Sequence, residues 1–424
     1  MLHKTGRNKM ATVNIFRELR DKYHSWGALK EYLTSDEGGK LIVVENDIDS
    51  RFCIVRYDKT VSNFAVPHVG AFRSVVWDTL QNLPVSVAPF KALEGAPTLE
   101  QVHDNSSIIQ EFVEGTMLQA FAGHESPEIR LATRSKFGAH TRFHSKRNFS
   151  ELIKDAPQYS ELNQILAITS LCKERPYTFT SLVLQHSEHK IVSVVPWPKL
   201  YVVSVGIVSA DGTIIISEDP RTWSEPARSY AIPTYINKNT DINALMAQYG
   251  WMWQGLVIKN VASLQRFRVI NPLYSSVKEL RGNESDDMLR FLRLRKAGQI
   301  QAYIYYYPEM REIYESYELK IREQTQSLFD EYCAIYKNKS DTKKTLKDVG
   351  WPHRSNVRAI HDIYKTQLKP AQQFVKKEVV VYYMNNIDIV KQRAFLVTPV
   401  GGKNYYRGRG DARYCQVCVI KTSY

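Results

Sequence analysis

Cysteine is scarce in this sequence, and its scarcity excludes a scaffold held together by disulfides. Five cysteines are spread over 424 residues. An odd and sparse set cannot form a disulfide framework, so we expect free thiols in a reducing compartment. Cys415 and Cys418 form a lone CQVC near the C-terminus. A structural zinc site has four ligands, and no second pair stands nearby, so no metal site is predicted there.

Long hydrophobic runs are also lacking. No stretch approaches the roughly 18 apolar residues that a membrane-spanning helix needs, so no membrane partner is expected. The N-terminal stretch MLHKTGRNKMATVNIF has charges without a long apolar run after them. It is therefore not predicted to be a secretory signal, and we expect a protein of the cytoplasm or of a virion that is not secreted.

Acidic residues are too few to balance the basic ones. The chain has 57 Lys and Arg against 44 Asp and Glu, which gives a net charge of +13. A basic excess attracts polyanions, and RNA or DNA is the commonest such partner. The alternatives are a merely basic surface or contact with an acidic protein. The hydrophobic content of 43% is ordinary for a globular protein, and the length suggests two or three domains.

Residues 1–275 are predicted to form an α+β body dominated by strands. Apolar residues at helical spacing over 12–34 predict two short helices. Short runs rich in β-branched and aromatic residues, separated by turn residues, predict the strands. They lie at 41–45, 52–57, 74–78, 85–89, 108–121, 129–134, 178–184, 191–208, 213–217, 253–260 and 266–270.

After Pro272 the pattern changes to helices. Apolar residues repeat every three to four positions, or a multiple, in the stretches 285–300, 308–338 and 354–368. We therefore predict a helical domain over residues 276–385, in which the aromatic stretches 303–310 and 379–386 pack the core. Residues 386–424 are predicted to be a basic tail, which is either a solvated end or an arm that contacts RNA.

Six short motifs between residues 73 and 274 resemble, in their order, those of the phage RNA ligase 1 family, within the covalent nucleotidyltransferases. They are RSVVWDTLQNLPVSVAPFK (73–91), EFVEGTMLQAF (111–121), TRSKFGA (133–139), TSLVLQHSEHKIV (180–192), QGLVIKN (254–260) and RFRVINPLY (266–274). The resemblance implies a nucleotidyltransferase, RNA-ligase-like domain with antiparallel sheets, followed by a helical C-terminal domain. An active member seals RNA through a lysine adenylate and uses ATP and Mg²⁺ as cofactors.

The residues that carry this chemistry in the family are replaced here. Phe112 stands two residues before the Glu114–Gly115 pair, where the family has its nucleophilic lysine. No lysine occurs between Lys91 and Lys136, so a small shift in register cannot supply one. A phenyl ring has no lone pair with which to attack a phosphate. At the positions of two carboxylates and two pocket lysines, the resemblance places Val183, Gln254, Arg268 and Ile270.

Other polar positions of the pocket are kept. The resemblance implies seven residues that bind nucleotide or phosphate: Arg73, Lys91, Glu114, Lys136, Gln254, Lys259 and Arg268. Arginine and lysine at a pocket mouth hold a polyphosphate or an RNA backbone without doing chemistry. The alternative for each is a surface charge or an ion-pair partner. Phe112 is expected either to pack in the core or to stack on a base.

His186 and His189 invite a metal or general-base role. Two histidines three residues apart converge on a helix, whereas the local pattern is that of a strand or turn. We therefore expect ordinary loop histidines, no metal site and no catalytic residue.

Three functions remain open. The first is an RNA-ligase-like pseudoenzyme that binds RNA, a nucleotide or a protein partner without lysine-adenylate chemistry. The second is an active ATP-dependent RNA ligase that joins a 5′-phosphate to a 3′-hydroxyl with a displaced lysine, Lys91 or Lys136. The third is a structural protein of a virion or larger assembly, because a fold does not dictate a function. The motifs FVEGTM and RFRVINPLY also resemble ligase-like proteins of large DNA viruses, which makes protein partners in a viral or replication assembly a further expectation.

Overall fold

The computed structural model describes residues 10–46, 49–143, 145–223, 230–338 and 344–397. The chain divides into two compact units, residues 1–278 and 279–422. The division falls within α8 (Pro272–Arg281), whereas the sequence analysis placed a boundary after residue 275.

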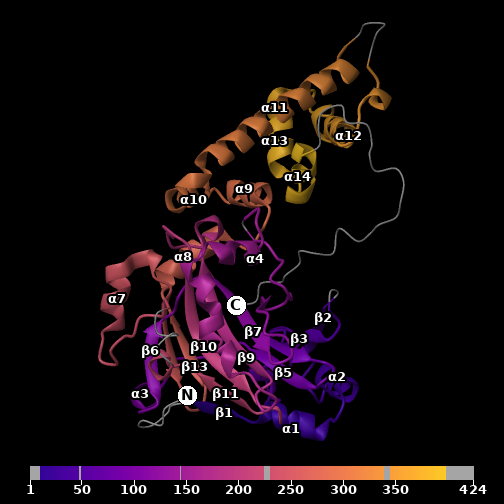
Figure 1. Cartoon of the computed structure of the whole chain (residues 1–424). Coiled ribbons are helices and arrows are strands. Elements are labelled where there is room, and N and C mark those ends of the chain that lie inside the picture. Colours follow the sequence, from indigo (N-terminus) through magenta and orange to yellow (C-terminus); the bar gives the residue numbers. More distant parts are fainter. Residues whose placement is uncertain (1–9, 47–48, 144, 224–229, 339–343, 398–424) are drawn as a thin grey trace. The chain divides into compact units, whose positions relative to one another are not determined.

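Within its described residues, the first unit contains three antiparallel sheets (Figure 1). The six-stranded sheet has, in spatial order, β1 (Ala11–Val13), β11 (Ile214–Ser217), β10 (Lys199–Val208), β9 (Tyr177–Gln185), β7 (Thr116–Gly123) and β8 (Arg130–Ala132). The three-stranded sheet has β13 (Arg266–Ile270), β12 (Gly255–Asn260) and β6 (Ser107–Glu111). The four-stranded sheet has β2 (Ile42–Glu45), β3 (Phe52–Arg56), β4 (Val75–Asp78) and β5 (Leu83–Val87).

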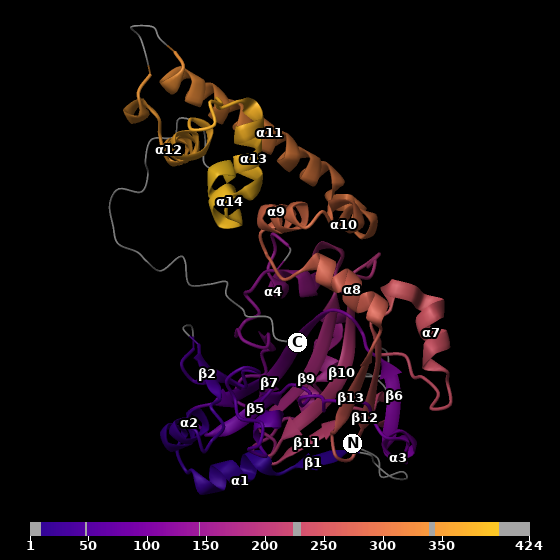
Figure 2. The same ribbon diagram turned by 180° about the vertical axis from the view of Figure 1, so that it is seen from behind.

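Short helices cover these sheets. They are α1 (Ile15–Lys22), α2 (Trp26–Thr34), α3 (Leu99–His103), α4 (Phe149–Leu152), α5 (Leu162–Ile165) and α7 (Ile242–Tyr249). Figure 2 shows α3 and α7 beside the three-stranded sheet. Side chains of both helices, among them Val102 and Leu245, pack against Ile109, Leu256 and Phe267 on one face of that sheet. The opposite face of the three-stranded sheet is therefore the one left for a site.

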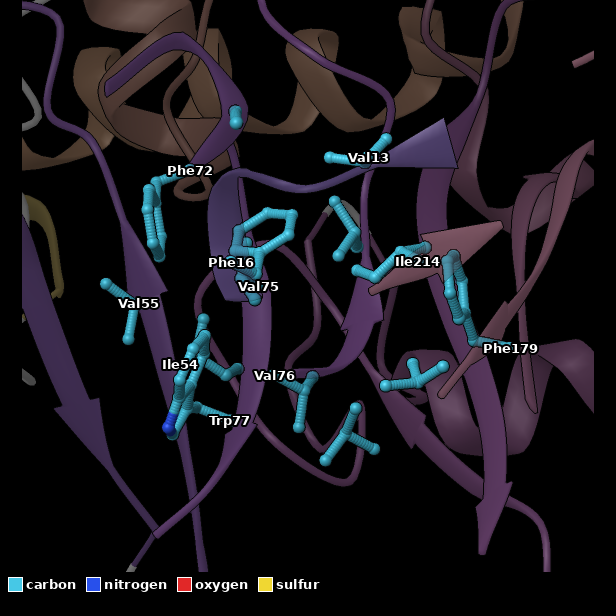
Figure 3. Close-up of a cluster of buried hydrophobic side chains, with 14 of the residues drawn as sticks. Val13, Phe16, Ile54, Val55, Phe72, Val75, Val76, Trp77, Phe179 and Ile214 are labelled. Carbon is cyan, nitrogen blue, oxygen red and sulfur yellow. The ribbon is translucent and has the colours of Figure 1, made fainter. Parts of the chain in front are cut away.

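The largest hydrophobic core joins the four-stranded sheet, α1 and one face of the six-stranded sheet (Figure 3). The ring of Phe16 on α1 meets the ring of Phe72 edge-on, with 5.3 Å between centroids, and lies 6.3 Å from the ring of Trp77. Phe179 on β9 fills the space opposite Gly206 on β10, where a Cβ would come within 2.3 Å of the phenyl ring. Successive side chains of a strand point to opposite faces of its sheet, so each sheet turns one apolar face to this core. The core therefore holds the two sheets together.

The second unit consists of helices in its described residues. They are α9 (Asp287–Lys296), α10 (Ile300–Tyr306), α11 (Arg311–Tyr336), α12 (His353–Ile363), α13 (Lys377–Asn386) and α14 (Ile389–Val397). Tyr303 and Tyr307 stack at 4.6 Å, Tyr303 and Tyr314 stack at 5.2 Å, and all three are buried. The stretch 303–310 thus packs the helical unit, as expected from its pattern.

The structure confirms the predicted class, an α+β body with antiparallel sheets followed by helices. Two expected strands are wrong in detail. The stretch 108–121 is two strands of different sheets, because Gly115 (φ +147°) breaks it. Residues 191–198 precede β10 instead of extending it, since Pro196 and Pro198 have no N–H for a ladder.

Two helical details also differ from the sequence analysis. The expected helix 285–300 is interrupted near Gly298 (φ +68°), which separates α9 from α10. Helix α14 occupies residues 389–397, which were assigned to the tail. The rest of that tail, with Cys415 and Cys418, lies outside the described residues. The cysteines that are described, Cys53, Cys172 and Cys333, are free, as predicted.

Replacing Phe16 by Ala is expected to lower the free energy of unfolding by about 3–5 kcal/mol, because it leaves a cavity between α1 and β4. Chemical denaturation of the full chain measures this loss. Leu80→Ala is the matched control, since Leu80 is 77% exposed and should change stability by no more than about 0.5 kcal/mol. Equal losses for the two variants would contradict the assignment of Phe16 to the core.

Candidate functional site

Phe112 lies just after β6, at the point where the chain leaves the three-stranded sheet. Its N–H donates to the carbonyl of Gly255 on β12 at 2.9 Å, and its side chain is half-buried. Three residues later, Gly115 turns the chain into β7 of the six-stranded sheet. A Cβ on Gly115 would lie 2.5 Å from the carbonyl oxygen of Leu184, so only glycine fits this turn. The expected nucleophile position therefore carries a partly accessible ring and no amine.

The carboxylate of Glu114 is buried and engaged with backbone. It accepts hydrogen bonds from the N–H groups of Val192 and Ser193 at 3.1–3.2 Å and from the Ser193 hydroxyl at 3.3 Å. Burial raises the pKa of Glu114, while these hydrogen bonds oppose the rise. These contacts make Glu114 an anchor for the loop 190–198, and no phosphate contact follows from them.

The face of the three-stranded sheet opposite α3 and α7 carries two of the seven predicted site residues, Lys259 and Arg268. The register places Val257 opposite both Gln110 and Arg268, and Lys259 opposite both Ile108 and Arg266. Ile109, Leu256 and Phe267 point into the core beside α7. The residues paired in this register alternate with them along the strands, so they lie on the opposite face of the sheet. Arg266 donates to both carboxylate oxygens of Glu218 at 2.7 Å. Glu218 follows β11, so this face is turned toward the six-stranded sheet.

Lys259 is the most deeply buried cation of this face. Lys259 is only 1% exposed, and its Nζ has no hydrogen-bond partner among the described residues. Burial lowers the pKa of Lys259 to about 8, the charges of Glu218 and Asp219 raise it and that of Arg266 lowers it. Both side-chain polar atoms of Gln110 are likewise buried without a partner among the described residues. Sequence reasoning placed Lys259 in the pocket, but nothing in the sequence shows that its amine is inaccessible.

Five cations from different segments come together at the edge of this face. They are Lys59, Arg73, Lys91, Arg134 and Arg268, and we call them the cation cluster. Partial burial lowers the pKa of Lys59, and the charges of the other four lower it further. Burial also lowers the pKa of Arg73, a charge–charge interaction with Tyr57 opposes this, and the positive charges of Arg134 and Arg268 are among the lowering causes. Lys59 is therefore within electrostatic range of the other four cations, and Arg73 of Arg134 and Arg268.

Arg134 takes the place that the sequence analysis gave to Lys136. The Arg134 guanidinium donates to the carbonyl of Arg73 at 3.4 Å and to that of Tyr57 at 3.2 Å, and lies 5.0 Å from the Tyr57 ring. Lys136 is exposed, and only its backbone has a hydrogen bond in the described structure. Both residues belong to the motif TRSKFGA, of which the sequence analysis named only Lys136.

Lys59 lies in no motif that the sequence analysis identified, and the charge of Lys91 is partly neutralised by an ion pair. Lys59 is exposed in the turn after β3. The Lys91 ammonium lies 2.9 Å from Glu94, whose side chain is well exposed, and 4.8 Å from the Phe64 ring. Arg73, Lys91 and Arg268 thus lie within electrostatic range of Lys59, and sequence reasoning did not single out Lys59 or Arg134. Phosphate binding by these residues stays a prediction.

The positions where the family has carboxylates carry none here. Val183 is buried against Val113 and Val203. Gln254 is half-buried, and its backbone carbonyl accepts from the N–H of Asn271 at 3.0 Å. Mg²⁺ prefers carboxylate oxygens, so these residues do not fit it.

One group of possible metal ligands occurs elsewhere in the described residues: Asp155, His186 and Glu188. Arg147 already bridges the two carboxylates, at 2.6 Å from Asp155 and 3.1 Å from Glu188, and these contacts lower the pKa of Asp155 to about 2. His186 Nδ1 accepts from the N–H of Glu188, so Nε2 carries the proton that faces Asp155 at 3.1 Å. The imidazole has no free lone pair, and an arginine supplies the positive charge, so the group is an ion-pair network.

His189 is also engaged at both ring nitrogens. Nδ1 lies 2.6 Å from the carbonyl of Phe143, and Nε2 lies 2.7 Å from the hydroxyl of Thr116. These contacts describe a structural histidine that ties the loop to β7.

Comparisons with known proteins give distant likenesses. No protein-family model matches the chain. A curated protein of Invertebrate iridescent virus 6, described as an immediate-early protein ICP-46 homolog, is 24% identical over 267 residues, which are 58% of this chain and 56% of that protein. The chain thus matches little more than half the length of this relative.

Two solved structures are also similar. An RNA ligase of Naegleria gruberi, solved as a mutant with ATP and Mn, is 11% identical, covers 44% of this chain and 58% of its own, and has a TM-score of 0.30. An archaeal ATP-dependent RNA ligase is 10% identical, covers 72% of this chain and 74% of its own, and has a TM-score of 0.38. Both TM-scores are below 0.5, too low to support an argument. Among the described residues, no helix combines the length and apolarity needed to cross a bilayer.

Replacing Lys259 by Met is expected to stabilise the protein near neutral pH by about 3 kcal/mol, because the pKa falls from 10.5 to about 8 on folding. Below pH 8 the amine is charged in both states. Between pH 8 and 10.5 the unfolded chain binds more protons than the folded one, so the wild type gains stability with pH and the gap to the variant closes.

Denaturation of both proteins across this pH range measures the gap. Lys154→Met serves as the control, since Lys154 is exposed on the same unit and its gap should stay flat. If the difference in free energy of unfolding between the wild type and Lys259→Met does not vary with pH, the Lys259 amine is not a buried charge.

Proposed function

We propose that this protein is an RNA-ligase-like pseudoenzyme, which binds RNA through the cation cluster and does not form a lysine adenylate. The observation that carries the proposal is the cation cluster itself. Lys59, Arg134 and Arg268 are exposed, while Arg73 and Lys91 are half-buried, so three of the five charges are open to solvent. The sequence resemblance to RNA ligases and the net charge of +13 point to the same partner.

The charge balance of the cluster favours a phosphate ligand. Glu94 pairs with Lys91 and also attracts Lys59 and Arg268, and Asp58 attracts Arg134, so among these described contacts two carboxylates face five cations. Like charges held together raise the free energy of the protein until an anion approaches. A phosphodiester backbone supplies several negative charges spaced along a strand, whereas a chloride ion supplies one.

The same geometry argues against adenylate chemistry. The step needs an unprotonated amine that can reach the α-phosphate of ATP. Phe112 supplies none, the Lys91 ammonium is paired with Glu94, and Lys136 lies outside the cation cluster. No carboxylate stands at Val183 or Gln254 to hold a metal ion.

An active RNA ligase with a displaced lysine is the second candidate, and Lys259 is the residue that favours it. Its pKa of about 8 leaves a fraction of neutral amine at physiological pH, and β12 runs beside β6. Its burial opposes this reading, because an amine that is 1% exposed meets no ATP without a rearrangement.

RNA binding is tested by fluorescence anisotropy with a labelled single-stranded RNA at about 50–200 mM salt. The double variant Arg73→Gln, Arg268→Gln is expected to bind at least about tenfold more weakly, a loss of about 1.4 kcal/mol. The slope of the logarithm of the RNA-binding constant against the logarithm of the salt concentration is negative, and its magnitude should fall by about 1.4, or about 0.7 per lost phosphate contact. Arg175→Gln, an exposed arginine outside the cluster, should leave both values unchanged. Absence of RNA binding at the lowest salt would refute the proposal.

Adenylate chemistry is tested separately. After incubation with radiolabelled ATP and Mg²⁺ followed by denaturation, the chain should carry no covalent label. A labelled peptide containing Lys259, Lys91 or Lys136 in mass spectrometry would establish the ligase instead. Substituting the labelled lysine by Met should then abolish the label.

A further inference from the structure

Glu94 is an acidic residue that lies directly against the cation cluster. Its carboxylate is 2.9 Å from the Lys91 ammonium. The Glu94 side chain is 88% exposed, whereas that of Lys91 is only 20% exposed. The carboxylate therefore stands on the solvent side of the ammonium, where an anion arriving from solution would meet Lys91.

The fold holds Lys91 in place, while Glu94 is held only through its backbone. The N–H of Lys91 donates to the carbonyl of Gly70 at 3.0 Å, and its ammonium lies 4.8 Å from the Phe64 ring. The N–H of Leu93 donates to the carbonyl of Arg266 at 2.8 Å, which fixes the chain just before Glu94. Of the two partners in the ion pair, the exposed Glu94 side chain is the one that can turn away when another anion arrives.

Direct contacts connect this ion pair with Arg134 of the cluster. The Phe64 ring, which Lys91 contacts, meets the Tyr57 ring with 5.1 Å between centroids. The Arg134 guanidinium lies 5.0 Å from the Tyr57 ring. Lys91 and Arg134 thus stand at the two ends of a row of two aromatic rings.

Glu94 also lies near Arg268. Leu93 is bonded to the backbone of Arg266, and Arg268 is two residues farther along β13, on the same face of its sheet. The hydrogen bond to Lys91 and the charge of Lys91 lower the pKa of Glu94, desolvation opposes this, and the charges of Lys59 and Arg268 lower it further. Glu94 therefore interacts with three of the five cations.

We infer that Glu94 is a built-in competitor of the ligand, whose carboxylate occupies the place on Lys91 that a phosphate of the RNA would take. The inference rests on the proposed function and adds a means of regulation to the same site. A carboxylate on the same chain acts at an effective concentration of roughly millimolar. An anion that binds Lys91 more weakly than this does not displace it, whereas a strand whose other phosphates are held by Arg73 and Arg268 does. Glu94 thus restricts Lys91 to ligands that are bound at several points.

Replacing Glu94 by Gln is expected to tighten the binding of a labelled single-stranded RNA by about three- to fivefold, because Lys91 loses an exposed ion-pair partner. Fluorescence anisotropy at about 50–200 mM salt measures this change. The magnitude of the salt slope should grow by about 0.7, since the freed Lys91 adds one phosphate contact.

Two controls separate this mechanism from a general effect of charge. Glu100→Gln changes the net charge by the same amount, and Glu100 is an exposed acid in the first turn of α3, so it should leave the RNA affinity and the salt slope unchanged. In a Lys91→Met background, Glu94→Gln should change the RNA affinity by less than about twofold, because the competitor then has no ammonium to cover.

An RNA affinity of Glu94→Gln equal to or below that of the wild type would overturn the inference and leave RNA binding by the cluster intact. An equal gain from Glu100→Gln would also overturn it, by making net charge the cause, and so would a full gain that persists in the Lys91→Met background. Absence of RNA binding by the wild type and by every variant would overturn the proposed function as well, so the two failures are distinguishable.

Discussion

Repulsion among cations that the fold holds together is the constraint on which the functional interpretation depends. Lys59 follows a strand of the four-stranded sheet, Arg73 and Lys91 flank two more of its strands, Arg134 follows the six-stranded sheet and Arg268 belongs to the three-stranded sheet. The three sheets must pack for the charges to meet, and hydrophobic burial is what packs them. The cluster is therefore stabilised by the core and destabilised by its own charge. An anion bound to the cluster would remove that destabilisation, which is the reason for proposing a polyanion as the ligand.

Lys259 is a further cation that the fold holds in an unfavourable place, here by burial. Its charge is compensated at a distance by Glu218 and Asp219, yet Glu218 is already bound by Arg266. In the pseudoenzyme that we propose, Phe112, Val183 and Gln254 supply neither the amine nor the acids of the ligase reaction. Lys259 is then left as a buried charge.

The class of the fold was predictable because hydrophobic alternation and helical spacing are local properties of the sequence. The short strands of the four-stranded sheet illustrate this, since each lies close to its expected range. The break at Gly115 and the end of the ladder before Lys199 were misjudged, because a run of β-branched residues looks the same in one strand or in two. The boundary of α14 was missed for a related reason: a short helix has weak periodicity.

The site was predictable only in part. Arg73, Lys91 and Arg268 were found through motifs, whereas Lys59 carries no motif and becomes relevant only when β3 is brought beside Arg134. Glu114 was marked by its place in a motif, but its role depends on a loop about 80 residues further along the chain, which gives it backbone N–H partners. Such pairings arise from tertiary packing, and a single sequence does not encode them in any local pattern.

The turn at Phe112–Gly115 has a mechanical consequence. Within four residues the chain passes from the three-stranded sheet to the six-stranded one. Phe112 holds the first sheet through Gly255, and Gly115 is pressed against Leu184 of the second. The two sheets cannot part at this corner without breaking both contacts. A second tie lies farther along β12, where Arg266, opposite Lys259, binds Glu218 after β11, so the two sheets are joined at two separate points.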